Sequence, residues 1–232
     1  MSSGLDYPHF LLNYKLYEGT AGAEGLALAR TIEAAAERTG ATVALAPQTP
    51  DLSRVAAETS VPVVAQSVDA FEPGRGTGRI SLPSVAAAGA DGVLVNHPES
   101  RATLPDVERA VAGCADHGLE SIVCVDGLEM GRAVLAFDPD CLLFEQPADI
   151  GTGESVVQTR PERVERFVAM VEETNPRTRV LLGGGISTAA DVERALELGA
   201  DAAGAASAFV EATDHRAWLS DIADALLAAA PD

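Results

Sequence analysis

Short apolar runs alternate with longer amphipathic stretches along the chain, from one end to the other. The apolar runs lack polar residues at alternate positions, which is typical of parallel strands covered on both faces. We predict strands over residues 10–13, 42–46, 61–66, 92–96, 121–125, 141–145, 180–183 and 201–206. We predict helices over residues 22–38, 51–58, 80–88, 104–117, 128–137, 161–174, 189–198 and 216–229.

This strict alternation in 232 residues favours an α/β fold closed into a (β/α)8 barrel. An open doubly wound sheet more often has fewer strands and a Gly-x-Gly-x-x-Gly turn after the first strand. No such turn follows residue 13, and no low-complexity linker divides the chain. We therefore expect a single barrel domain over residues 1–232.

The composition is strongly acidic, with 35 acidic residues, 16 basic residues and a formal net charge of −19. Such a surface repels nucleic acids and anionic membranes, so neither is an expected partner. The sequence has no apolar run of the ~18 residues that a membrane helix needs, and no secretory leader is visible. We expect a cytoplasmic protein.

Lys15 is the only lysine of the chain, and every other basic residue is an arginine. Acid-rich, lysine-poor surfaces resemble those of proteins from salt-loving organisms, in which salt screens the repulsion between like charges. A lysine that remains in such a composition is a candidate functional group, because its compact ammonium is not replaced by a planar guanidinium.

The cysteines and histidines give no sign of a metal site. The three cysteines lack Cys-x-x-Cys spacing, and two of them lie in apolar runs, so buried reduced thiols are expected. The four histidines lie far apart and lack His-x-x-x-His pairing. We expect no bound metal.

Polar side chains collect where the predicted strands end, and in a barrel of this kind that face carries the site. Asn13 and Lys15 follow the first strand, His97 follows the fourth, and Glu145 ends the sixth, directly after an apolar run. Each residue alone has an ordinary structural explanation, but their joint placement at strand ends does not. We expect an ammonium, an imidazole and a carboxylate to meet at one mouth.

The loops around this mouth suit a phosphate group. Glycine-rich turns around Gly185 and Ala206 follow the last two strands, where exposed backbone N–H groups commonly bind phosphate. Pro98 suits the first position of a short helix whose start would favour a neutral His97 ring. Glycines at 151 and 153 suit a lid that closes over the ligand.

Four motifs in chain order resemble those of the triosephosphate isomerase family, over nearly the whole chain. They are Asn13-x-Lys15, Asn96-His-x-Glu-x-Arg101, Phe144-Glu145 with Ile150-Gly-Thr-Gly153, and Gly183-x-Gly-Ile-Ser187 with Ala206-Ser207. The short length and the glycine turns are similar to those of the archaeal branch. The resemblance implies the TIM-barrel fold and an isomerase that needs no metal or organic cofactor.

The resemblance also implies a reaction and a set of roles. Glyceraldehyde 3-phosphate and dihydroxyacetone phosphate would interconvert through an enediol(ate), with Glu145 as base and His97 as a neutral electrophile. Lys15 and Asn13 would stabilise the oxyanion. Backbone groups that would hold the phosphate come from Ile150, Gly151, Gly185, Ala206 and Ser207. A homo-oligomer, dimer or tetramer, is implied, with residues 71–78 as the projecting loop and Thr77 at the interface.

Some positions depart from the family pattern. Pro98 stands where a serine is usual, Gln146 replaces a proline at the start of the lid, and Ala208 replaces a glycine in the phosphate turn. The predicted eighth strand has unusually small residues. Two alternatives therefore stay open: an isomerase of another small phosphorylated sugar, such as a tetrose phosphate, and a non-catalytic paralogue that binds phosphometabolites.

Overall fold

The computed structural model describes residues 5–71, 74–146 and 155–228. Within these residues, eight parallel strands form one sheet in the order β2-β1-β8-β7-β6-β5-β4-β3. A parallel bridge between Leu45 and Val63 joins the two end strands, and the Leu45 N–H donates to the carbonyl of Pro62 at 2.9 Å. The strands are β1 (His9–Asn13), β2 (Thr42–Ala46), β3 (Val64–Ala65), β4 (Gly92–Val95), β5 (Glu120–Val125), β6 (Cys141–Phe144), β7 (Arg179–Leu182) and β8 (Ala202–Ala205).

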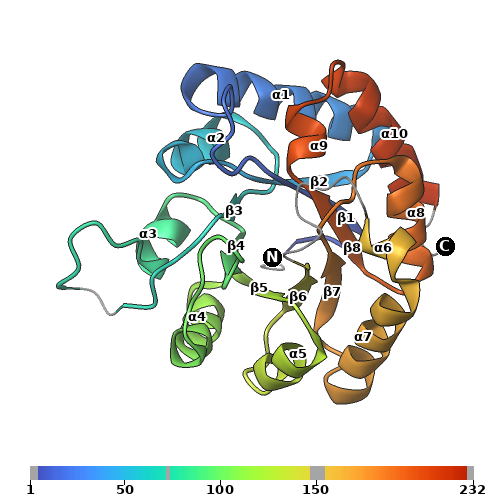
Figure 1. Cartoon of the computed structure of the whole chain (residues 1–232). Helices are drawn as coiled ribbons and strands as arrows, with labels where there is room; N and C mark the ends of the chain where they lie inside the picture. Colours follow the sequence, from blue (N-terminus) through green and yellow to red (C-terminus); the bar gives the residue numbers. More distant parts are fainter. Residues whose placement is uncertain (1–4, 72–73, 147–154, 229–232) are drawn as a thin grey trace.

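Helices surround the ring of strands (Figure 1), and the predicted barrel is confirmed. The helices predicted from periodicity are α1 (Gly22–Thr39), α2 (Leu52–Glu58), α3 (Leu82–Ala87), α4 (Leu104–His117), α5 (Leu128–Leu135), α7 (Pro161–Thr174), α8 (Ala189–Glu197) and α10 (His215–Ala228). Between β3 and α3, residues 66–71 and 74–81 extend away from the barrel. In the described ranges, no helix combines the length and the apolar content that crossing a membrane requires.

Three short elements were not predicted: η1 (Thr49–Asp51), α6 (Val156–Thr159) and α9 (Ser207–Val210). Pieces of this length are shorter than the window in which helical periodicity can be read. The predicted third strand, 61–66, was too long, because it contracts to Val64–Ala65. Pro62 has no N–H to donate to a ladder, which limits the pairing at that end.

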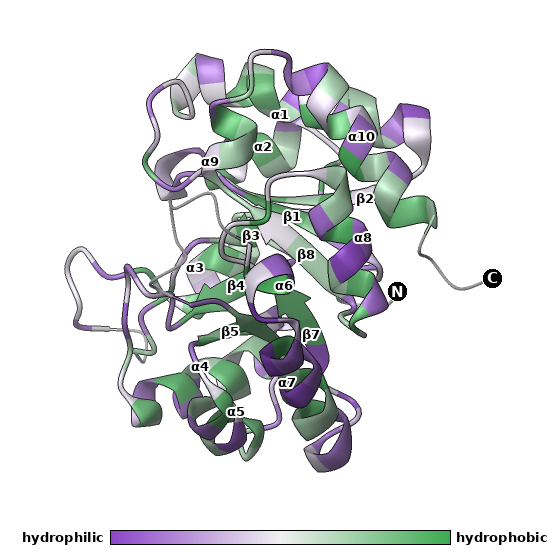
Figure 2. Ribbon diagram, turned by 45° about the vertical axis from the view of Figure 1, so that its right-hand side comes forward, coloured by the Kyte–Doolittle hydropathy of each residue, from purple (hydrophilic) through white to green (hydrophobic). Residues whose placement is uncertain are grey.

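The strands are buried on both faces, as their continuous apolar sequences predicted. One set of side chains fills the barrel interior, including Leu11, Ile122, Leu143 and the cysteines of β5 and β6. The alternate set packs outward against the helices, for example Phe10 and Phe144. Figure 2 shows this arrangement as mostly green strands surrounded by helices of mixed colour. All three cysteines are buried and unpaired, as expected.

The small residues of β8 have a packing explanation. A Cβ on Gly204 would lie 2.9 Å from the carbonyl oxygen of Leu11 and 3.4 Å from the Leu11 Cβ and a Leu181 methyl. Real Cβ atoms do not tolerate so close an approach to backbone. Small residues in β8 therefore allow β1 and β7 to approach and close the barrel on that side.

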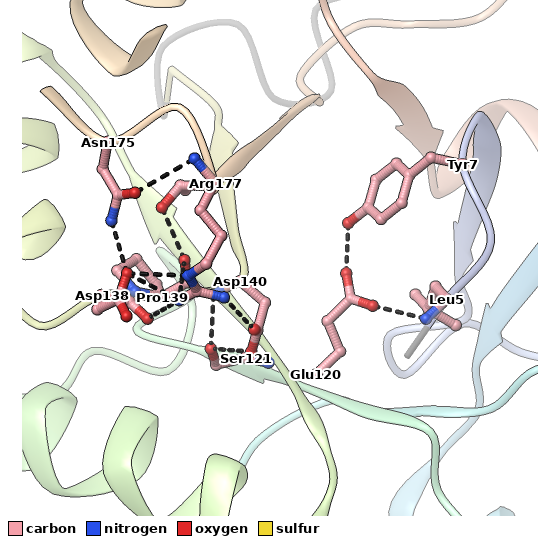
Figure 3. Close-up of polar contacts among 10 residues, drawn as sticks. Leu5, Tyr7, Glu120, Ser121, Asp138, Pro139, Asp140, Asn175 and Arg177 are labelled. Carbon is pink, nitrogen blue, oxygen red and sulfur yellow. Dashed lines mark hydrogen bonds and ion pairs between the residues drawn. The ribbon is translucent and has the colours of Figure 1, made fainter. Parts of the chain in front are cut away.

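The amino ends of the strands are covered by the N-terminal segment (Figure 3). The Leu5 N–H donates to Oε2 of Glu120 at 2.6 Å, and the Tyr7 hydroxyl donates to Oε1 of the same carboxylate. Leu5 packs against the side chains of the barrel interior. Next to it, Arg177 binds the carboxylates of Asp138 and Asp140. Both groups of contacts lie on the face opposite to the carboxyl ends of the strands.

Candidate active site

A cavity of about 400 Å³ opens at the carboxyl ends of the strands. Its floor is made by interior side chains of the barrel, including Leu11, Leu94, Leu143 and Leu181. Every predicted site residue that the structure describes lines this one cavity: Asn13, Lys15, His97, Glu145, Gly185, Ala206 and Ser207. The predicted positions Ile150 and Gly151, and the glycine-flanked lid, lie outside the described residues.

Lys15 is held in a constrained backbone conformation. Its φ of 43° lies in the left-handed region, which is rare for residues other than glycine and costs ~1–3 kcal/mol. Two side chains hold it there: Oδ1 of Asn13 accepts from the Lys15 N–H at 2.8 Å, and Nε2 of Gln66 donates to the Lys15 carbonyl at 3.1 Å. The conformation places the ammonium over the cavity.

The ammonium of Lys15 pairs with a carboxylate whose role the sequence did not predict. Nζ lies 2.8 Å from Oε1 of Glu99, and only 13% of the lysine side chain is exposed. Glu99 was named only as part of the Asn96–Arg101 motif, without a role of its own. Gln66 was also missed, although it ends the predicted third strand on the face that carries the site. The only signals were the motif for Glu99 and a strand-end position for Gln66.

His97 is buried, and its neutral form is favoured. Burial lowers the pKa of His97, the positive charges of Lys15 and Arg101 lower it further, and Glu99 partly opposes them. The backbone N–H of Glu99 donates to Nδ1 at 3.1 Å. A nitrogen that accepts a hydrogen bond carries a lone pair, so the proton of the neutral ring is on Nε2.

The short helix predicted after His97 is wrong. The Ser100 N–H closes a single turn onto the His97 carbonyl at 2.7 Å, and the next helix, α4, begins at Leu104. Asn96 directs the chain into this turn from a left-handed conformation with φ 61°. Its amide donates to the Cys124 carbonyl at 3.0 Å and accepts from the Ala102 N–H at 3.1 Å. A single backbone N–H, that of Glu99, therefore contacts the His97 ring where the start of a helix was expected.

Glu145 is a buried carboxylate with an oxygen free for another group. Its Oε2 has no hydrogen-bond partner in the described structure and lies 3.4 Å from Nε2 of His97. Burial raises the pKa of Glu145, Lys15 partly opposes this effect, and Glu99 adds to it. Poor solvation of the charged form makes a carboxylate more basic than it is in water. Such a group can remove a proton from a molecule bound in the cavity.

Gln146 supplies a hydrogen bond at the place where the family pattern has a proline. Its amide donates to the carbonyl of Asp126, the residue after β5, and only 8% of Gln146 is exposed. Arg163 donates to the same carbonyl at 3.2 Å. The residue after Glu145 is therefore fixed by side-chain contacts instead of by a proline ring.

The other end of the cavity is lined by backbone. Gly184 and Gly185 have φ of 78° and 80°, which side chains rarely adopt. In the part of the chain that the structure describes, the N–H groups of Gly184, Gly185 and Ile186 donate to no backbone or side-chain acceptor. The first turn of α9 likewise leaves the N–H groups of Ser207 and Ala208 without intrahelical acceptors.

Ala208 fits this backbone without strain. It lies within α9, in an ordinary right-handed helical turn, so an alanine in place of the family's glycine carries no conformational penalty. Its side chain lines the cavity, together with Tyr17, Ser187 and Glu211. Tyr17 and Glu211 were not predicted, because neither lies at a strand end or in a recognised motif.

The sequence profile described as triosephosphate isomerase matches residues 8–226. This chain belongs to the triosephosphate isomerase family. The triosephosphate isomerase of Methanobrevibacter smithii is 37% identical over 222 residues, which are 96% of this chain and 100% of that protein. That of Methanopyrus kandleri is 41% identical over 224 residues, covering 96% of this chain and 99% of the relative.

A solved structure gives the same fold at low sequence identity. The triosephosphate isomerase of Bartonella henselae superposes with a TM-score of 0.73 at 19% identity, covering 94% of this chain and 98% of that one. The family, its enzyme class as an isomerase and the barrel fold are thus confirmed.

Proposed function

We propose that this protein interconverts glyceraldehyde 3-phosphate and dihydroxyacetone phosphate through an enediol(ate). Membership of the triosephosphate isomerase family supports the substrate and the reaction. One observation carries the proposal for this chain. Lys15, His97 and Glu145 are remote in sequence but line one cavity, and one oxygen of Glu145 has no hydrogen-bond partner in the described structure.

In the proposed reaction, Glu145 removes a proton from the carbon next to the carbonyl and later returns it to the neighbouring carbon. A base of raised pKa suits this step, because proton transfer is most efficient when the pKa of the base approaches the working pH. Only 8% of Glu145 is exposed, so little of its surface is open to solvent even before a substrate binds.

His97 acts on the oxygens of the substrate. Its Nε2–H donates a hydrogen bond to the carbonyl oxygen, stabilises the negative charge that develops there, and relays a proton between the two oxygens. A neutral imidazole suits this proton relay, because it can donate its Nε2 proton to one oxygen and accept a proton from the other. The Glu99 N–H on Nδ1 keeps the proton on the nitrogen that faces Glu145.

Lys15, the only lysine in the chain, supplies its ammonium to the same oxygens and to the charged phosphate. Asn13 holds the lysine backbone and adds a polar group to the wall of the cavity. The phosphate is bound by backbone N–H groups of Gly185, Ala206 and Ser207. Those of Gly185 and Ser207 lack an acceptor in the described structure, and the anion supplies one. Ile150 and Gly151 complete this set in the proposal.

The test is turnover of glyceraldehyde 3-phosphate by the purified protein and by Glu145→Gln. The variant keeps the shape of the side chain but cannot accept the proton. We expect kcat to fall by ~10³-fold or more while an unreactive phosphate, such as inorganic phosphate, still inhibits competitively. Turnover in Glu145→Gln at the wild-type rate would contradict the proposal.

One departure from the family pattern bears on which small phosphorylated sugar is the substrate. Ala208 narrows the phosphate end by a methyl group relative to the family's glycine. Parallel assays on triose and tetrose phosphates distinguish the two, and equal or faster turnover of a tetrose phosphate would reassign the substrate. Binding of phosphate without turnover of either would indicate a non-catalytic paralogue.

We also propose that the protein is a cytoplasmic homo-oligomer. Leu16, 83% exposed, and Phe71, 52% exposed, are the most exposed large hydrophobic residues among those described. Arg79 packs on Phe71, with its Cζ 5.0 Å from the centroid of the Phe71 ring. The same guanidinium pairs with Asp69, with 2.8 Å between Nη1 and Oδ1. Sedimentation of wild type and Phe71→Glu tests the proposal, since the charge should favour the monomer.

A further inference from the structure

The turn of residues 183–188, here called the phosphate turn, joins β7 to α8 and lines the cavity up to Ser187. Two side chains bond to this turn from outside the cavity, Asp191 and Trp218. A third, Gln158, bonds to Asp191. None of the three belongs to the residues described as lining the cavity. They come from α6, α8 and α10.

Asp191 holds the end of the turn through one carboxylate oxygen. Oδ2 accepts from the Ser187 N–H at 3.1 Å, the Thr188 N–H at 3.1 Å and the Thr188 hydroxyl at 2.9 Å. The other oxygen accepts from Nε2 of Gln158 at 3.3 Å. Both oxygens are thus engaged, and the orientation of the carboxylate is fixed.

Part of this arrangement is the capping box of α8, in which Asp191 accepts from the Thr188 N–H. The bonds to the Ser187 N–H and to Gln158 go beyond a cap. At the start of α4, Asp106 occupies the same position after Thr103, but 37% of its side chain is exposed and it pairs with Arg109. Asp191 is only 5% exposed, and no lysine or arginine in the described ranges forms an ion pair with it. Burying a carboxylate is costly unless hydrogen bonds compensate. For Asp191, the compensating hydrogen bonds include those from the backbone N–H groups of Ser187 and Thr188 in the phosphate turn.

Trp218 holds the same turn from α10. Its indole N–H donates to the Ser187 carbonyl at 2.9 Å. Its ring also packs on Phe209 of α9, with 5.8 Å between ring centroids. Trp218 therefore contacts both elements that form the backbone-lined end of the cavity, and it is the only tryptophan in the chain.

We propose that Asp191 and Trp218 are positioning residues that set which N–H groups of the phosphate turn bind the substrate. The proposal rests on the isomerase function proposed above. Asp191 takes up the N–H groups of Ser187 and Thr188, and Trp218 takes up the Ser187 carbonyl. The N–H groups of Gly184, Gly185 and Ile186 are left for the anion. Gln158 fixes the orientation of Asp191 from α6.

The test separates binding from chemistry. In Asp191→Ala, the end of the turn loses its acceptor, so we expect KM for the triose phosphate to rise about tenfold while kcat changes less than about threefold. The inhibition constant of inorganic phosphate should rise by the same factor as KM. Asp191→Asn keeps one acceptor oxygen and should recover most of the affinity. Trp218→Phe keeps the aromatic packing, loses only the N–H donor, and should raise KM by a smaller factor.

Asp106→Ala is the matched control, because it removes the aspartate at the same position of α4, which bonds to the N-cap threonine, and should leave KM and phosphate inhibition unchanged. The fluorescence of Trp218 provides a readout that needs no turnover: titration with inorganic phosphate should change its emission in wild type, at about tenfold higher concentration in Asp191→Ala. If wild type binds phosphate but does not turn over, the proposed function fails and the positioning role is still measured. KM and phosphate affinity within twofold of wild type in both Asp191→Ala and Trp218→Phe would overturn the proposal.

Discussion

The backbone N–H of Glu99 donates to Nδ1 of His97 at 3.1 Å, while Nε2 of the same ring lies 3.4 Å from Oε2 of Glu145. The hydrogen bond requires a lone pair on Nδ1, so the ring proton lies on the Glu145 side. A donor two residues along the chain therefore sets the tautomer that the proposed reaction needs.

We expect ¹⁵N NMR of the imidazole to show the neutral Nε2–H tautomer at pH 6.5. Burial and the neighbouring Lys15 lower the pKa of His97 below its usual value, so the ring should gain its second proton only at more acidic pH. The spectrum of His97→Gln assigns the signal. A ring that is half protonated at pH 6.5, or a proton on Nδ1, would show that the Glu99 contact does not have this role.

The acid limb of kcat/KM should lie above pH 4.5. Burial raises the pKa of Glu145, and the proposed base is its carboxylate form, so activity is present above the raised pKa and lost as the pH falls through it. The measurement is the pH profile of kcat/KM, with circular dichroism in the same buffers to exclude unfolding. A limb at the pKa of an ordinary, exposed glutamate would argue against Glu145 as the base.

Gln66→Leu should impair catalysis with little loss of fold. Nε2 of Gln66 donates to the carbonyls of Lys15 and Ala46, each at 3.1 Å, and supports the left-handed backbone of Lys15. Leucine keeps the volume but not the donor, so the ammonium should lose its position, and kcat/KM should fall about tenfold. Steady-state kinetics and a melting temperature measured side by side provide the check. An unchanged kcat/KM would mean that Asn13 holds Lys15 without help.

His9 should make the protein sensitive to acid. It is fully buried at the start of β1, and burial lowers its pKa to about 4. The unfolded chain binds a proton near pH 6.5 and the folded chain does not, so stability is complete above pH 6.5 and falls between pH 6.5 and 4. The loss is at most about 3 kcal/mol.

The variant His9→Phe tests this pH dependence. Phenylalanine keeps an aromatic ring beside Tyr7, whose ring centroid lies 4.6 Å from that of His9, and it cannot be protonated. Urea unfolding from pH 7.5 to 4.5 should give a flatter stability profile for the variant. Parallel profiles for the two proteins would assign the acid sensitivity to other groups.

The stability of the protein should rise with salt. With a formal net charge of −19, repulsion between acidic residues opposes the compact state, and salt shortens its range from ~10 Å at 0.1 M to ~3 Å at 1 M. Thermal unfolding in a potassium chloride series from low to molar concentration measures the effect. A melting temperature already maximal at low salt would show that the acidic surface is not an adaptation to salt.

The order of strands and helices could be read from the sequence because apolar periodicity reports burial directly. Parallel strands covered on both faces have continuous apolar runs, as in residues 141–144. The general place of the site followed too, since the carboxyl ends of all strands in a barrel lie on one face. Lys15, His97 and Glu145 were found in this way, with the family motifs as independent support.

What the sequence left undetermined are contacts between side chains that are remote along the chain. Glu99 meets Lys15 across 84 positions, and Gln66 reaches the carbonyl of Lys15 across 51. No local pattern records such pairs, because they form only when the barrel closes and the loops meet. The turn after His97 was misjudged for a related reason: its conformation is set by Asn96 bonding to Cys124 on the next strand.

The amino-acid sequence by itself determined which segments are buried and which polar residues lie at the carboxyl ends of the strands, because both depend on local pattern and on the parallel direction of the strands. Only the tertiary structure decided how those residues are held: which nitrogen of His97 carries the proton, which side chains support Lys15, and which N–H groups stay free in the phosphate turn. Each of these depends on hydrogen bonds of fixed length and direction, and three-dimensional packing supplies that geometry.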